Sequence, residues 1–381
     1  MKKNKAIGMY LHIPFCKQKC FYCDFVSYSG KEVLHREYVE ALKQEITEVA
    51  NQITNSIDTI YIGGGTPSYL RGEDIQQLID TIQKKYQVEE KAERTIEVNP
   101  GTVTEEKLQI YRNSGINRIS IGLQTNDNML LKEIGRIHRK EDFLETYQLA
   151  RKVGFTNCNV DMMIGLPKQT MQEVKETLQQ LLSLQPEHIS VYSLILEEGT
   201  KLYQLVEQGK LTLPEETLER QMYWYVKEQL QLAGYCHYEI SNFAKLGYES
   251  KHNVHCWKQK EYIGMGVAAH SYYKNRRYSN TEDLRFYLSC IETKKREQMT
   301  MVQEIQDKKA KQKEYMLLGL RMIQGVSINE FMEQFGVNPM EEYAKEIEGL
   351  IHKQLLRRKQ DSIQLTEKGL DFANIVWEEF I

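Results

Sequence analysis

The sequence lacks features that would place the protein in or across a membrane. No apolar run approaches the roughly 20 residues that a membrane-spanning helix requires. Residues 1–13 contain lysines but no signal-peptide core or small-residue cleavage site, and they lead directly into a predicted strand. We therefore expect a cytoplasmic protein. The odd number of cysteines, seven, agrees with a compartment where thiols stay reduced.

The chain also lacks a large charge of either sign. The formal net charge is −3, which gives no overall electrostatic argument for nucleic-acid binding. A hydrophobic content of 41% and a charged content of 27% are ordinary for a soluble globular protein. The 381 residues exceed one typical domain, and we expect a division into residues 1–213 and 214–381.

The first 213 residues alternate β-rich runs with helical runs, a pattern typical of a parallel sheet covered by helices. Six βα units are too few for a closed eight-stranded barrel, so the sequence predicts a partial (β/α)6 barrel. The predicted strands are residues 8–13, 59–64, 95–100, 118–124, 158–165 and 188–196. In parallel barrels, functional groups gather at the C-terminal ends of the strands.

Three cysteines follow the first predicted strand: Cys16, Cys20 and Cys23, in the pattern CxxxCxxC. A CxxC pair alone would also fit a redox disulfide or half of a zinc site. No fourth thiol or histidine stands nearby to complete a tetrahedral zinc site. Three thiolates can instead bind three irons of a cubane cluster and leave the fourth iron open. The spacing predicts a 4Fe-4S cluster.

Polar and glycine residues follow the other predicted strands. GGGTP, with Gly64 and Gly65, fits either a tight turn or a loop that approaches a ligand closely, and the GxGxxG spacing of a dinucleotide site is absent. Glu97, Gln124 and Asp161 stand at or near the ends of later strands. Any one of them alone would pass as a helix cap or a surface group, but several on one barrel face indicate a site.

The string YLHIPFCKQKCFYCDF resembles the signature of the radical S-adenosylmethionine (SAM) enzymes. Within them it is similar to the branch that contains the oxygen-independent coproporphyrinogen III dehydrogenases and the HemW-type heme chaperones. The resemblance implies a 4Fe-4S cluster and SAM as cofactors, with an electron donor such as a flavodoxin or ferredoxin. The positions that match SAM-contacting motifs are Tyr10, Tyr22, Gly64, Gly65, Thr66, Glu97, Gln124, Arg136 and Asp161.

These positions suit the functional groups of SAM. Glu97 could accept from the ammonium or from a hydroxyl, and Arg136 could pair with the carboxylate. Asp161 could bind the ribose, while Gln124 could contact a hydroxyl or the adenine edge. The sequence does not decide which atom each residue contacts.

From residue 214 onward the alternation stops, and we expect an α+β accessory domain. Residues 300–381 read as three helices, a hairpin and a closing helix, which resembles a winged-helix module. Such a module can bind DNA through basic wing residues, here Arg357, Arg358 and Lys359. No basic helix accompanies these charges, so we interpret them as a solvated turn and expect no nucleic-acid partner.

Two features separate the branches. The dehydrogenases carry a further cysteine two residues after the third, where this chain has Phe25, so that coproporphyrinogen dehydrogenase activity is doubtful. The heme-chaperone branch carries a His-Asn-x-x-Tyr-Trp element, and residues 252–257 read HNVHCW. His252, His255 and Cys256 are chemically able to ligate heme iron, and Trp257 could stack on the macrocycle. Alternatively, the segment is a structural loop at the barrel mouth.

The first hypothesis is therefore a chaperone that binds heme and transfers it to an acceptor protein. The resemblance implies an acceptor such as a heme protein of the respiratory chain. The second is a coproporphyrinogen III dehydrogenase, and the third is a radical SAM enzyme with another substrate. Phe25 favours the first over the second. Whether the protein is an enzyme stays open at this point.

Overall fold

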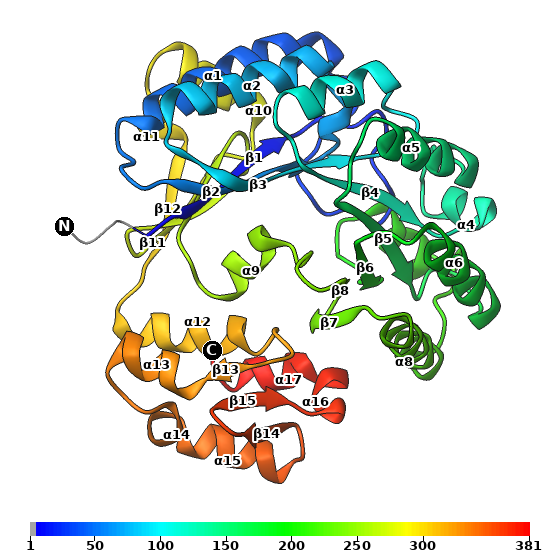
Figure 1. Ribbon diagram of the computed structural model, residues 1–381, viewed down its shortest axis with the longest axis vertical. Helices are drawn as coiled ribbons and strands as arrows, with labels where there is room; N and C mark the ends of the chain where they lie inside the picture. The colour runs from blue at the N-terminus through cyan, green and yellow to red at the C-terminus, as the bar shows by residue number, and fades with distance from the viewer. Residues whose placement is uncertain (1–4) are drawn as a thin grey trace.

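The computed structural model describes residues 5–381, and its centre is a curved sheet of twelve strands (Figure 1). Six parallel strands stand next to one another in chain order, which confirms the predicted (β/α)6 pattern. They are β1 (Ile7–Ile13), β2 (Ile57–Gly64), β3 (Val88–Val98), β4 (Arg118–Gln124), β5 (Cys158–Ile164) and β6 (His188–Ser193). Their apolar side chains are largely buried, as expected where helices cover one face of a parallel sheet and the other face lines the barrel.

Helices cover the outer, convex side of this sheet (Figure 1). They are α1 (His35–Ala50), α2 (Gly72–Lys85), α3 (Glu105–Asn113), α4 (Asn128–Glu133), α5 (Lys140–Lys152), α6 (Met171–Leu184) and α8 (Glu216–Leu232). The short helix α7 (Lys201–Glu207) instead lies beside Phe21, where Leu202 N donates to Phe21 O at 2.7 Å. In α2, Ile75, Leu78, Ile79 and Ile82 are all buried. This i, i+3, i+4, i+7 spacing places them on one helix face, which explains why the segment packs as an amphipathic helix.

The sheet continues beyond the predicted domain boundary at residues 213/214. At one edge, β9 lies parallel to β1, and three antiparallel strands follow it; at the other edge, a hairpin pairs with β6. These strands are β7 (Cys236–Glu239), β8 (Asn242–Ala244), β9 (Tyr262–Met265), β10 (His270–Tyr273), β11 (Arg276–Asn280) and β12 (Thr300–Ile305). The alternation of strands and helices stops after residue 213 because most of the later strands are antiparallel, and antiparallel neighbours need no crossover helix between them. We therefore propose a division near residue 306.

Residues 308–381 form a C-terminal module with its own core, around Tyr315, Phe331, Tyr343 and Phe380. Its elements are α12 (Lys308–Gly319), β13 (Val326–Ser327), α13 (Ile328–Phe335), α14 (Pro339–Glu342), α15 (Ala344–His352), β14 (Leu356–Lys359), β15 (Ser362–Leu365), α16 (Glu367–Asp371) and α17 (Ala373–Glu378). The helices and the three-stranded sheet agree with the expected winged-helix-like arrangement. The three basic residues from Arg357 to Lys359 are exposed but lie on strand β14 and not in a turn, because their segment pairs with β15.

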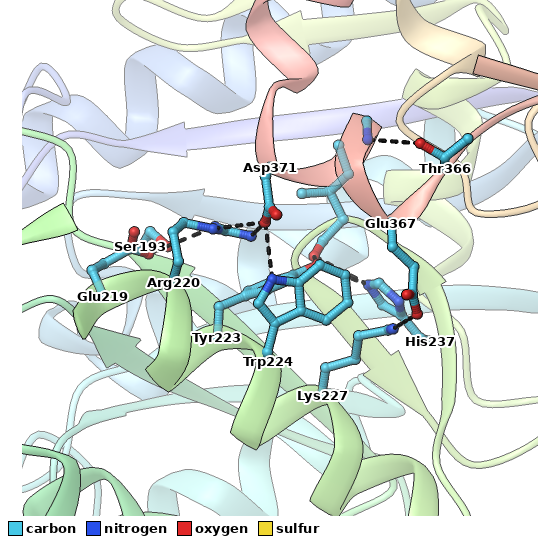
Figure 2. A network of polar contacts seen from close by, with 12 residues as sticks. Ser193, Glu219, Arg220, Tyr223, Trp224, Lys227, His237, Thr366, Glu367 and Asp371 are labelled. Atoms are coloured by element: carbon cyan, nitrogen blue, oxygen red, sulfur yellow. Dashed lines mark hydrogen bonds and ion pairs between the residues drawn. The ribbon is translucent and has the colours of Figure 1, made fainter. Parts of the chain in front are cut away.

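The module is held against the barrel helix α8 by a carboxylate with three donors (Figure 2). Asp371 of α16 accepts from Arg220, whose Nε lies 2.8 Å away, and from Trp224 Nε1 at 3.0 Å. Lys227 and Glu367 add an ion pair at 3.5 Å. This contact lies close to the C-terminal end of β6, because Glu219, next to Arg220, accepts from Ser193 Oγ. Elsewhere in the module, α12 packs against α9 (Lys251–Trp257) (Figure 1).

We expect Asp371→Ala to lower the free energy of unfolding by about 1–2 kcal/mol, because three donors lose one partly exposed acceptor. Chemical denaturation of the full chain would measure this change. Glu379→Ala is the matched control, because the Lys353–Glu379 pair is more exposed and should contribute less than about 0.5 kcal/mol. Equal effects of the two substitutions would contradict the anchoring role of Asp371.

No helix within residues 5–381 is long and apolar enough to cross a membrane. This finding agrees with the absence of long apolar runs in the sequence.

Candidate functional site

The three cysteines lie on a loop that leaves the C-terminal end of β1. The loop is fastened near its start, where Cys16 N donates to Tyr28 O at 3.0 Å and Tyr28 N donates to Pro14 O at 2.7 Å. A turn brings the other two cysteines together, since Cys23 N donates to Cys20 O at 3.2 Å. The C-terminal end of a parallel strand is the place where the barrel architecture predicts such a site.

The cysteine loop also docks on the segment before Arg136. Phe21 N donates to Ile134 O at 3.0 Å, and Gln18 Nε2 donates to Gly135 O at 3.0 Å. Gly135 has φ +78°, and a Cβ there would lie 2.5 Å from the Phe21 ring. The two segments therefore hold each other, and this contact places Arg136 beside the cysteines.

Cys16, Cys20 and Cys23 all line one cavity of about 470 Å³. Burial raises the pKa of Cys16 and raises that of Cys23 to about 11, so thiolates here need positive charge nearby. Within residues 5–381, no three His, Cys, Asp or Glu side chains converge tightly enough for a single metal ion. A cubane cluster fits better, because each cysteine binds a different iron and the thiols stay apart.

The GGGTP loop packs directly beneath the cysteine loop. Gly64 has φ +109°, and a Cβ there would lie 2.5 Å from the His12 ring. A Cβ on Gly65 would lie 2.9 Å from backbone atoms of Ile13 and Phe15. Both glycines line the cavity as well, so this loop is a tight turn and a cavity wall at once.

Glu97, at the end of β3, is held by two donors. Tyr61 Oη donates to its Oε1 at 2.8 Å, and Gly64 N donates to its Oε2 at 3.2 Å. Burial is the main cause that raises its pKa to about 7, and the nearby Asp161 adds to the shift. A cationic ligand beside this buried carboxyl group would stabilise its ionised form.

Arg136 and Asp161 supply the other charges of the cavity. Arg136 Nη1 donates to Asn99 Oδ1 at 2.8 Å, and its guanidinium lies 5.9 Å from the centre of the Tyr22 ring. Asp161 Oδ1 accepts from Asn159 Nδ2 at 2.7 Å, and burial raises the pKa of Asp161. The cavity thus presents carboxylates and a guanidinium to one ligand.

Gln124 ends β4 in an uncommon backbone conformation. Its φ is +72°, and the β4–β5 register shifts between Gly122 and Gln124. The bulge turns the buried Gln124 side chain toward the cavity, which it lines. Strained non-glycine residues of this kind cluster at functional sites.

The sequence motifs do not single out Asn99, which the structure places at the cavity. Its Nδ2 donates to Thr66 Oγ1 at 2.9 Å, and Thr66 Oγ1 donates to Cys16 Sγ at 3.3 Å. With its bond to Arg136, Asn99 links the guanidinium to the cysteine loop. A signal was present, because Asn99 stands two residues after Glu97 and alternate residues point to the same face.

Of the nine residues expected to contact SAM, eight line this cavity and Tyr10 does not. Tyr10 lies deeper in the barrel, where its ring stacks on Tyr61 at 6.3 Å between centroids and its hydroxyl contacts His12 Nδ1 at 3.0 Å. It therefore supports residues behind the cavity. Phe25 lies at the cavity rim and is 63% exposed. The position where the dehydrogenases carry a further cysteine therefore holds an exposed aromatic ring in this chain.

The HNVHCW segment is helix α9, and it closes the opposite, N-terminal end of the barrel, not its mouth. His252 is buried, contacts Thr59 Oγ1 through Nδ1 at 2.9 Å, and stacks on Tyr61 at 5.2 Å between centroids. Glu93 accepts from the first backbone amides of α9, those of Lys251 and His252, at 3.1 and 3.2 Å. Because Nδ1 is engaged with Thr59, ligation of a heme iron by His252 would use Nε2.

The structure does not bring His252, Cys256 and Trp257 together on one open surface. Cys256 is partly buried, and burial raises its pKa to about 11. Trp257 has the Arg321 guanidinium over its ring at 4.3 Å, so one indole face is already covered. The cavity that holds the cysteines and the HNVHCW segment thus lie at opposite ends of the barrel, with Tyr61 in contact with both His252 and Glu97.

Comparisons with known proteins agree with this geometry. Residues 10–181 match the model of the radical SAM superfamily, and residues 306–372 match that of the HemN C-terminal domain. The chain is 38% identical to "Heme chaperone HemW" of Lactococcus lactis, covering 99% of this chain and 98% of that protein. It is 37% identical to the Bacillus subtilis protein of the same name, with 98% of each covered, and 34% identical to the Escherichia coli one, with 100% of each covered.

The chain belongs to the HemW family of radical SAM proteins. A solved structure, coproporphyrinogen III oxidase (HemN) from Escherichia coli, matches its fold with a TM-score of 0.86 at 22% identity, covering 99% of this chain and 90% of that one. The radical SAM family implies a 4Fe-4S cluster and SAM as cofactors. The match to the HemN C-terminal domain begins at residue 306, where the twelve-stranded sheet ends.

Proposed function

We propose that this protein binds heme and transfers it to an acceptor protein. The observation that carries the proposal is the similarity, along the whole chain, to proteins named as heme chaperones. The acceptor would be a heme protein, such as one of the respiratory chain. Away from the cysteine loop, a separate groove of about 850 Å³ is lined in part by Lys251, Val254 and His255 of α9.

In this proposal Cys16, Cys20 and Cys23 hold the 4Fe-4S cluster, and the cavity beside them holds SAM. When bound, the two cofactors supply one-electron reductive cleavage of SAM, fed by an electron donor such as a flavodoxin or ferredoxin. Arg136, fixed by Asn99, pairs with the SAM carboxylate. Gln124 and Asp161 bind the nucleoside part by hydrogen bonds.

Glu97 accepts from the SAM ammonium, and this role makes SAM binding depend on pH. Its pKa of about 7 means that the carboxylate is mostly protonated below pH 7 and ionised above it. We expect SAM affinity to rise about fivefold to tenfold from pH 6 to pH 7.5, because only the ionised form attracts the ammonium. Calorimetric titration of the anaerobic, cluster-loaded protein would measure this rise.

Glu97→Gln is the control for that titration. It keeps the size of the side chain but cannot ionise, so its weaker SAM affinity should stay flat over the same pH range. An unchanged pH dependence in Glu97→Gln would assign the titration to another group.

A second candidate is oxygen-independent coproporphyrinogen III dehydrogenase, which the shared fold of the HemN structure favours. That reaction uses a further thiol two residues after the third cysteine in the dehydrogenase motif. Here Phe25 stands there, exposed at the rim of the cavity, and an aromatic ring cannot replace a thiol. The third candidate, a radical SAM enzyme with another substrate, has no specific observation in its favour.

Heme transfer can be tested directly. The cluster-loaded protein would be charged with 55Fe-heme and mixed with membranes from heme-depleted cells that carry apo-cytochromes. We expect label to move to the membranes and cytochrome absorption bands to appear, faster than from heme-loaded serum albumin. Heme that stays on the protein, or moves no faster than from albumin, would contradict a chaperone role.

A further inference from the structure

Asp161 stands at the end of a chain of buried hydrogen bonds that leads away from the cavity of the cysteines. Asn159 precedes it by two residues on β5, so the two side chains lie on the same face of the sheet. Asn159 lies beside His188 in the β5–β6 register, and the two residues are only 3% and 1% exposed. His188 in turn contacts the Tyr238 hydroxyl of β7. Four side chains on three strands are thus connected.

The contacts of Asn159 determine how its amide group is oriented. One amide atom lies 2.7 Å from Asp161 Oδ1 and 2.8 Å from Ser120 Oγ, and the other lies 2.6 Å from His188 Nδ1. An ionised carboxylate can only accept, so the atom that faces Asp161 is the nitrogen, which donates. The amide oxygen therefore faces His188 and accepts from its ring.

Both ring nitrogens of His188 have a defined role in this chain. Nδ1 carries a proton, because Asn159 Oδ1 can only accept. Burial lowers the pKa of His188 well below its usual value, so the ring is neutral and Nε2 accepts. Tyr238 Oη donates to Nε2 at 2.7 Å and itself accepts from Ser250 N at 3.3 Å. Every bond in the chain thus donates in one direction, toward Asp161.

This direction matters because Asn159 provides the donor that holds the Asp161 carboxylate. With the amide rotated by half a turn, its oxygen would face the carboxylate and repel it. Burial raises the pKa of Asp161, and the hydrogen bond from Asn159 is the largest influence that opposes this rise. Asp161 lines the cavity, and a carboxylate can accept several hydrogen bonds, so it is still able to bind a ligand.

We propose that Asn159, oriented by His188 and Tyr238, is the positioning residue that makes Asp161 an acceptor for a ribose hydroxyl of SAM. This inference rests on the SAM site of the proposed function. Asp161 lines the cavity, whereas the three residues behind it do not, so they act through Asp161 and not by contact with the ligand. A buried network in which each group is satisfied holds one arrangement of its members, which suits this role.

The test compares SAM with its 2′-deoxy and 3′-deoxy analogues in calorimetric titrations of the full, cluster-loaded chain. The wild type should bind one of the two analogues about tenfold more weakly than SAM, because a hydrogen bond to a charged acceptor is lost. In Asn159→Leu this penalty should fall to about twofold, since the carboxylate is no longer held. Both ligands are compared on one sample, so a partly unfolded fraction cancels from the ratio. The matched control is His237→Leu, which removes a buried histidine that stacks on Phe243 and contacts Ile240 O, and it should keep the wild-type penalty.

A rescue experiment separates positioning from packing. His188→Leu should lose the penalty, and His188→Asn should regain most of it, because its amide nitrogen can take the place of Nδ1 as the donor to Asn159. A full penalty in Asn159→Leu, or equal penalties in His188→Leu and His188→Asn, overturns the positioning role while SAM binding stands. Equal binding of SAM and both analogues by the wild type overturns the ribose contact of Asp161 and the positioning role with it. If the wild type binds no SAM, the SAM site of the proposed function fails too.

Discussion

Replacing Cys20 by alanine is expected to abolish stable cluster loading. After anaerobic reconstitution, the wild type should hold about four irons and four sulfides per chain, and Cys20→Ala close to none. In each variant only two cysteine thiolates remain to bind the cluster, and no other cysteine lines the cavity to replace the third. The same result is expected for Cys16→Ala and Cys23→Ala, because all three thiols line one cavity.

Cys236→Ala is the matched control, because Cys236 is an exposed thiol on β7 outside the cavity. Iron and sulfide analysis with electronic absorption would compare the variants. Loading of Cys20→Ala at the wild-type stoichiometry would refute the cluster assignment, and a loss in Cys236→Ala would show that thiol removal acts through folding.

The second large effect is expected from Arg136→Leu, which should weaken SAM binding by about two orders of magnitude. Arg136 combines a bond to Asn99 at 2.8 Å with a position over Tyr22, so the guanidinium is already oriented before the ligand arrives. Removing one partner of a buried, hydrogen-bonded charge pair, here the guanidinium that would pair with the SAM carboxylate, typically weakens the binding free energy by about 2–5 kcal/mol. SAM titration of the cluster-loaded variant, read by the EPR spectrum of the reduced cluster, would measure the loss.

Arg139→Leu is the control for that experiment. It makes the same chemical change three residues away, but its side chain is 70% exposed and its ion pair is with Glu141. SAM binding should be unchanged in Arg139→Leu. Equal losses in the two variants, or none in Arg136→Leu, would contradict the carboxylate-binding role of Arg136.

The barrel and its catalytic face were accessible from sequence because local patterns determine them. Each parallel strand carries its own apolar run, and the polar residues follow at the strand ends, as Glu97 follows β3. The family resemblance then added positions such as Thr66, which local patterning alone does not distinguish. Eight of the nine expected SAM residues line one cavity, although their direct contact with SAM remains a prediction.

The parts that escaped prediction depend on contacts between distant segments. Nothing near residue 262 indicates that β9 pairs in parallel with β1, which is why the sheet extends past the expected boundary. For residues 252–257 the sequence predicts a loop or a heme-binding segment, whereas the structure has the helix α9. This short polar stretch packs against Thr59 and Glu93, which are far away in the chain. Tertiary hydrogen bonds of this kind leave no periodic signal.

The most direct test of the central claim combines a substrate and a ligand in one anaerobic experiment. The cluster-loaded protein would be supplied with SAM, a reductant and coproporphyrinogen III, and the products analysed for vinyl groups, while a parallel sample is titrated with hemin. A heme-binding protein that carries Phe25 should form no vinyl product at catalytic turnover and should saturate at one hemin per chain. Catalytic conversion of coproporphyrinogen III, or the absence of saturable hemin binding, would contradict it.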